Sequence, residues 1–79
     1  MKDKLILHAI IMKKTKFKSK EQAFNKADEM FPNEKLKGFV RDSGPSFRVR
    51  AVPKTKFIHT SFISKKITPD ITLVFGYLK

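Results

Sequence analysis

The sequence predicts an α+β two-layer sandwich in which one helix packs on a mostly antiparallel, four- to five-stranded sheet. Three observations support this class. A single segment has the apolar spacing of an amphipathic helix, and the other apolar segments are short runs rich in β-branched and aromatic residues. A chain of 79 residues has room for one hydrophobic core, so residues 1–79 are expected to form a single domain. The predicted element order is β-α-β-β-β-β.

The first predicted strand is Leu5–Met12, an apolar run bounded by lysines. Its length favours a strand over a helix, and apolar residues at both odd and even positions indicate a central strand. His8 has the same parity as Ile6, Ile10 and Met12, which predicts a histidine in the core or at an interface.

The predicted helix begins after Ser19 and ends before Pro32. Ser19 and Gln22 have the spacing of a capping box, and proline stops a helix. One apolar stripe is expected to pack on the sheet, and it consists of Ala23, Phe24, Ala27, Met30 and Phe31.

A β-hairpin is predicted within residues 38–53, around the turn sequence Asp42-Ser43-Gly44-Pro45. Only a register that pairs odd with even positions, and therefore an even-numbered loop (Asp42–Pro45 or Ser43–Ser46), puts all the apolar residues on one face. The dry face then consists of Val40, Phe47, Val49 and Ala51. The wet face carries Arg41, Arg48 and Arg50 around Phe39. Because one helix covers only one side of a sheet, this arginine face is expected to stay uncovered.

Two further strands are predicted, at Phe57–Ser64 and at Ile71–Leu78, with turns at Lys65-Lys66 and Thr68-Pro69-Asp70 between them. Parity does not decide which side of Phe57–Ser64 is buried. The last strand has Ile71, Leu73, Phe75 and Tyr77 on one face. Gly76 indicates a bulge or a close approach of another part of the chain.

Composition argues against several classes of function. The chain has no cysteine, which excludes disulfides and thiolate chemistry. Its seven acidic residues and two histidines form no catalytic or metal-binding spacing, and its three glycines are isolated, so we expect no enzyme activity, no metal site and no cofactor. The run Leu5–Met12 is too short to span a bilayer and precedes no signal-peptide cleavage site. A cytoplasmic protein without a membrane partner is therefore expected.

The net charge of +11 is the strongest compositional signal, and it predicts an anionic partner, with nucleic acid (DNA or RNA) as the first choice. Arginines on a strand face with an aromatic residue beside them suit phosphate contact and base stacking. Five lysines in residues 13–20 and two in the connector after Pro53 add further phosphate contacts. The predicted nucleic-acid-binding residues are Phe39, Arg41, Arg48, Arg50, Lys13, Lys14, Lys16, Lys18, Lys20, Lys54 and Lys56.

The alternative prediction is a phage-type or regulatory protein that binds an acidic surface of a host or cellular protein and modulates it. Arginine with aromatic residues is also the composition of interface hot spots, so the sequence leaves the two partners open. The edge strands of a small sheet additionally offer a route to a homodimer through strand pairing.

Overall fold

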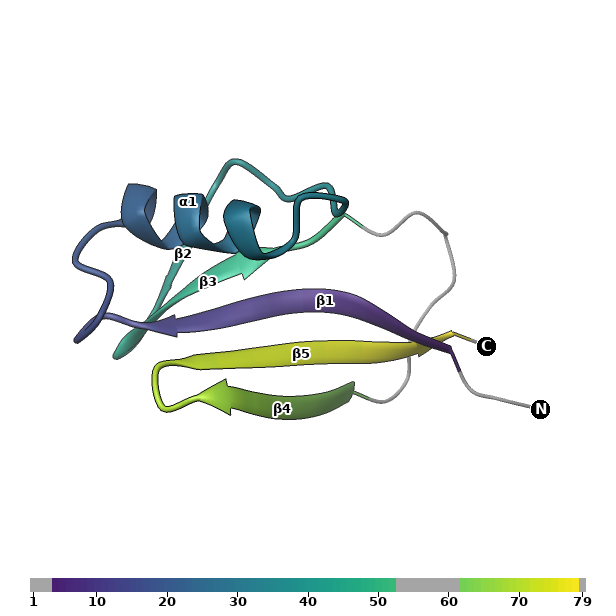
Figure 1. The fold of residues 1–79 in the computed structure, drawn as a ribbon. Helices are drawn as coiled ribbons and strands as arrows, with labels where there is room; N and C mark the ends of the chain where they lie inside the picture. The colour runs from purple at the N-terminus through teal and green to yellow at the C-terminus, as the bar shows by residue number, and fades with distance from the viewer. Residues whose placement is uncertain (1–3, 53–61, 79) are drawn as a thin grey trace.

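The computed structural model describes residues 4–52 and 62–78 and has one helix packed on a five-stranded antiparallel sheet (Figure 1). The elements are β1 (Lys4–Lys13), α1 (Lys20–Met30), β2 (Arg41–Ser43), β3 (Ser46–Arg50), β4 (Phe62–Thr68) and β5 (Ile71–Leu78). The strand order across the sheet is β2-β3-β1-β5-β4. This arrangement confirms the predicted α+β class and the predicted element order.

β1 is the central strand, as predicted, and pairs antiparallel with β3 and β5. The prediction that His8 lies on the same side of the strand as Ile10 and Met12 was wrong. The pairing with β5 runs from Leu7↔Phe75 directly to Ala9↔Val74, so His8 is an extra residue that forms a β-bulge. The bulge reverses the alternation, and His8 therefore lies on the side of the sheet opposite to Ile10 and Met12.

The helix begins and ends at the residues that its capping signals indicate. Ser19 Oγ accepts a hydrogen bond from the amide of Gln22, and the Gln22 side chain accepts one from the amide of Lys18. Phe31 closes the last turn by donating its amide to the Ala27 carbonyl. No helix within the described residues is long and apolar enough to cross a membrane.

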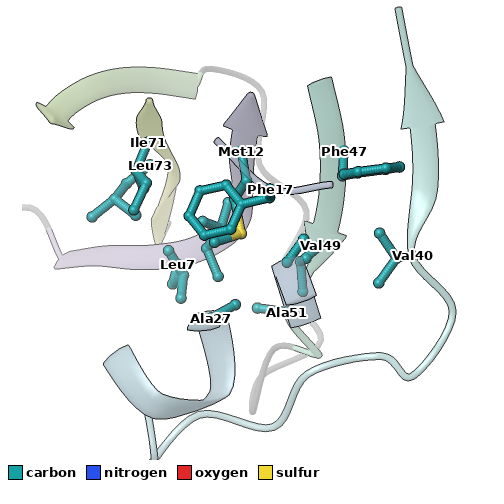
Figure 2. Packing of buried hydrophobic residues seen from close by; sticks show 12 residues of the cluster. Leu7, Met12, Phe17, Ala27, Val40, Phe47, Val49, Ala51, Ile71 and Leu73 are labelled. Carbon is teal, nitrogen blue, oxygen red and sulfur yellow. The ribbon is translucent and has the colours of Figure 1, made fainter. Parts of the chain in front are cut away.

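The core lies between α1 and the β3 half of the sheet (Figures 1 and 2). Ala23 and Ala27 of the helix are fully buried, while Phe24, Met30 and Phe31 pack partly buried against the core, which confirms the predicted stripe. Small side chains at 23 and 27 let the helix approach the sheet closely. Figure 2 shows the side chains that meet there, among them Leu7, Met12, Phe17, Val49 and Leu73.

The hairpin of β2 and β3 has the predicted register. Arg41 pairs with Arg48, and Ser43 pairs with Ser46 across a two-residue turn of Gly44 and Pro45. Gly44 has φ +61°, the positive value that a tight hairpin turn requires at its first central position and that proline cannot adopt. The predicted dry face is confirmed, because its four apolar residues are all buried.

β2 is shorter than the sequence suggests, and the chain before it leaves the ladder. Leu36 forms an isolated bridge to Ala51, and Arg41 pairs with Arg48. Between these two pairs the chain advances by five residues on the Leu36 side and by three on the Ala51 side. The two additional residues make the segment before Arg41 bulge outward. Val40 still points into the core, whereas Phe39 is 72% exposed.

The strand after the hairpin extends further along the chain than predicted. β4 covers Phe62–Thr68, so Lys65 and Lys66 belong to the strand and not to a turn, and the tight turn is at Pro69 and Asp70. Residues 57–61 of the predicted strand lie outside the described residues. β5 covers Ile71–Leu78 as predicted, and Ile71 and Leu73 are buried in the core. Every residue of β4 is exposed, because the helix lies over the other half of the sheet.

Candidate nucleic-acid interface

The side of the sheet away from α1, here called the open face, is defined by three rows of paired residues. The first row crosses all five strands and consists of Arg41, Arg48, Ile11, Thr72 and Lys66. The second row consists of Arg50, Ala9, Val74 and Ser64. The third row consists of Ile6, Gly76 and Phe62, with His8 in the bulge beside it.

The first row is basic at both ends. Arg41 and Arg48 are direct cross-strand partners, and like charges in that position destabilise a sheet. Lys66 lies at the far end of the same row, about 19 Å away at the usual strand spacing. None of these three cations forms an ion pair with any residue that the structure describes. Their charges therefore remain available to an external anion.

The second row adds Arg50 next to the small residue Ala9. The pairing Ala9↔Arg50 places a long side chain beside a methyl group, and Ala9 is completely buried although it lies on the side of the sheet away from α1. The Nε of Arg50 is itself buried and has no hydrogen-bond partner in the described part of the chain. An unpaired buried donor costs about 1–3 kcal/mol, so the position of Arg50 on the open face lowers the stability of the fold.

The third row carries an aromatic pair. Phe62 lies directly across from Gly76, and the missing side chain at Gly76 leaves room above β5. The Phe62 ring extends over this gap toward the bulge, where its centroid lies 4.7 Å from that of His8 at an interplanar angle of 38°. The bulge in this pair of strands is at His8 of β1 and not at Gly76.

His8 also joins the aromatic pair to the arginines. An open depression on the sheet is lined by His8, Arg41, Arg48 and Arg50, together with Asp42 and Ser43 at its edge. The bulge at His8 is therefore what brings an imidazole into the arginine cluster. Phe62 remains 52% exposed.

Phe39 lies where the open face meets the β2 edge of the sheet. Its ring lies 5.6 Å from the ammonium of Lys20, which is a cation–π distance. A second depression at this edge brings Phe39 and Lys20 together with Lys37, Arg41, Asp42 and Arg50. The predicted neighbourhood of Phe39 and the arginines is therefore present, with Phe39 at its rim.

The lysine-rich segment lies on the helix side of the sheet, away from the open face. Lys14 Nζ lies 2.6 Å from one oxygen of Asp42 and 5.1 Å from the Phe47 ring centroid, and Lys20 Nζ lies 3.6 Å from the other oxygen. The hydrogen bond from Lys14, with the positive charges of Lys14 and Lys20, holds the pKa of Asp42 below its ordinary value of 3.8. Two of the predicted lysines, Lys14 and Lys20, thus already form ion pairs with the Asp42 carboxylate.

The remaining predicted lysines differ in their surroundings. Lys18 Nζ donates to the Thr15 carbonyl at 2.9 Å, while Lys13 and Lys16 are exposed. All of them lie near the turn end of the hairpin, where the backbone of Lys14 bonds to Pro45. Lys54 and Lys56 lie outside the described residues. The structure therefore gathers the three arginines with Phe39, and Lys20 is the residue of the lysine segment that reaches this group, through Phe39 at the β2 edge.

Sequence reasoning missed Lys66, His8 and Phe62 as residues of this surface. Lys66 was assigned to a turn. Phe62 belonged to a run in which the alternation of residues did not show which side is buried. His8 was assigned to the core side because a bulge has no signature in a single apolar run. The one available signal was Gly76, which marked a place where another group approaches the backbone.

The chemistry of the open face is that of an anion-binding surface with aromatic groups. Its three rows contain no acidic residue, and Asp42 at the border is paired to lysines on the helix side. Within the described residues, no three His, Cys, Asp or Glu side chains gather closely enough to hold a metal ion.

Comparison of the chain with protein-family models, with curated proteins and with solved structures gave no match.

Proposed function

We propose that this protein is a small, basic, non-enzymatic nucleic-acid-binding protein and that the open face is its binding surface. The observation that carries the proposal is the row in which Arg41 directly opposes Arg48, while neither guanidinium forms an ion pair with any residue that the structure describes. Phosphates bound along the row would neutralise the repulsion between the two guanidinium groups, and arginine is suited to bidentate phosphate contact. The net charge of +11 supports the same partner through long-range attraction.

The test is the affinity of the full chain for fluorescently labelled oligonucleotides, measured by anisotropy over a series of salt concentrations. We expect Arg41→Ser/Arg48→Ser to bind at least about tenfold more weakly than the wild type. Loss of two phosphate contacts should also flatten the slope of log affinity against log salt by roughly 1.4 on a single strand and 1.8 on a duplex.

The matched control is Lys26→Ser/Lys35→Ser, which removes the same charge from residues outside the open face. We expect the control to change affinity only through net charge, and therefore much less. Equal losses in the two double variants would mean that binding follows overall charge, and the open face would then not be the site. Thermal unfolding of each variant separates lost binding from lost structure.

The second candidate is a protein that binds an acidic surface of another protein. The specific observation in its favour is Phe39, which is 72% exposed at the rim of a depression that Lys20 and Arg41 also line. An exposed aromatic ring among cations matches the composition of interface hot spots. A partner recovered at equal stoichiometry from nuclease-treated lysate, and lost with Phe39→Ala, would favour this function. Indifference of the protein to oligonucleotides would be required as well.

A further inference from the structure

We propose that the open face is specific for single-stranded nucleic acid, with an unpaired base stacked on Phe62 and adjacent phosphates held by Arg41, Arg48 and Arg50. This inference rests on the nucleic-acid-binding function proposed above and names its substrate. It comes from the position of Phe62, which the sequence did not place on this surface.

The first step is the presentation of the Phe62 ring. The ring lies on the open face and is 52% exposed, while His8 contacts it at 4.7 Å between centroids. Gly76 beneath it leaves the ring room to lie over β5. A ring that the fold already orients loses little conformational freedom when a base stacks on it, which favours binding.

The second step is the distance between the aromatic pair and the cations. Along the strands, Arg50 is one row from Phe62 and the Arg41–Arg48 row is two rows away, or about 7 and 14 Å. Across the sheet, β3 is three strands from β4, or about 14 Å, so the backbone positions of Arg50 and Arg48 lie roughly 16 and 20 Å from that of Phe62. His8 lies between the ring and the arginines and lines the depression with them. A short stretch of one strand therefore spans from phosphates on the arginines to a base on Phe62.

The third step separates single strands from duplexes. In a duplex each base is stacked on its neighbours and paired, so its flat face cannot reach a side chain on a sheet surface. A single strand exposes base faces that stack on aromatic rings whatever the sequence. A duplex would use only the arginines, whereas a single strand would use the arginines and the ring together.

The experiment measures the affinities of the full chain for a labelled 20-nucleotide single strand, as DNA and as RNA, and for a duplex of the same length. We expect Phe62→Ala to weaken single-strand binding by roughly 5- to 100-fold. Its salt slope should stay unchanged, because no charge is removed. Phe62→Trp should retain binding. The matched control is Ile63→Ala, the next residue of β4, which is exposed on the opposite side of the sheet.

Phe62→Leu covers the case in which Phe62→Ala fails to fold, because leucine keeps the apolar bulk and lacks the aromatic ring. Wild-type affinity of a folded Phe62→Leu would overturn base stacking, as would equal losses for Phe62→Ala and Ile63→Ala. A duplex that binds as tightly as both single strands would also overturn the proposal. A preference for DNA or for RNA would identify the natural strand and support it.

The two proposals fail in different ways. If Arg41→Ser/Arg48→Ser loses binding while Phe62→Leu keeps it, the protein binds nucleic acid and the stacking inference is wrong. If the wild type binds none of the three oligonucleotides even at low salt, the nucleic-acid-binding function itself is wrong.

Discussion

Arg41 lies directly opposite Arg48, and both side chains are on the side of the sheet away from α1. A pair of like charges at one position of a ladder lowers the stability of the fold, and a bound anion removes that penalty. The pair therefore predicts that stability and binding respond in opposite directions to a change of charge at residue 41.

Arg41→Glu should stabilise the protein and weaken nucleic-acid binding. The substitution replaces a repulsive cross-strand pair with an attractive one, worth about 0.2–1 kcal/mol in the free energy of unfolding. Thermal unfolding followed by circular dichroism should show the gain most clearly at low salt, because salt screens the interaction. Arg41→Gln serves as the control and should fall between the two. A lower melting temperature for Arg41→Glu would argue against a repulsive pair.

Asp42→Asn should make the protein less stable at neutral pH and bind nucleic acid more tightly. The folded-state pKa of Asp42 is lowered, so its ion pairs stabilise the fold above the unfolded pKa near 3.8 and lose that effect as pH falls through the folded pKa. The difference in unfolding free energy between wild type and Asp42→Asn should therefore be present at pH 5–7 and vanish in stronger acid. Binding should tighten because Lys14 and Lys20 lose their carboxylate.

The control for this experiment is Asp28→Asn, which removes an exposed acid that has no ion pair within the described residues. Its effect on stability should not follow the same pH profile. Identical profiles for the two variants would mean that net charge, and not the contact with Lys14, sets the acid sensitivity.

Ser19→Ala should destabilise the protein by about 0.5–2 kcal/mol through loss of the helix cap. The Ser19 side chain satisfies the amide of Gln22, which is otherwise one of the unpaired donors at the start of α1. For a chain of this size the loss corresponds to a fall in melting temperature of several degrees, roughly 4–8 °C per kcal/mol. Ser19→Asp also caps and suits the helix dipole, so it should keep the stability of the wild type.

Amide hydrogen exchange should divide the sheet into two parts. The amides of β1 and β3 lie in the half that packs on α1 and should be the most protected. Among the described strands β4 pairs with β5 alone, and all of its side chains are exposed, so its amides should exchange much faster. Exchange measured by nuclear magnetic resonance would show this ordering, and equal protection of β3 and β4 would contradict it.

The hairpin and the helix were predictable because their signals are local. Strand alternation has a period of two, so one register alone buries Val40 with Phe47 and Val49, and Gly44 and Pro45 suit the turn. The helix has its cap and its stripe within one short segment. These elements placed the three arginines on one face of the sheet, away from α1, which is the part of the site that sequence alone could define.

The rest of the open face depends on contacts between distant segments. The bulge at His8 is a feature of the pairing of β1 with β5, and it cannot be predicted from residues 5–12 alone. β4 begins at Phe62 within a run of mixed parity, so neither Phe62 nor Lys66 could be assigned to a face. The approach of Phe62 to His8 needs Gly76 on a strand between them, and strand order is set by tertiary packing.

The single extra residue at His8 means that the first strand contains two segments in opposite phase. Before it the odd-numbered residue Leu7 enters the core, and after it the even-numbered residues Ile10 and Met12 do. Deleting His8 would make Leu7↔Phe75 and Ala9↔Val74 successive pairs of a regular ladder, so Leu7 would stay in the core and the open face would lose the imidazole that contacts Phe62. The extra residue thus adds a side chain to the open face without changing which apolar side chains of the first strand enter the core.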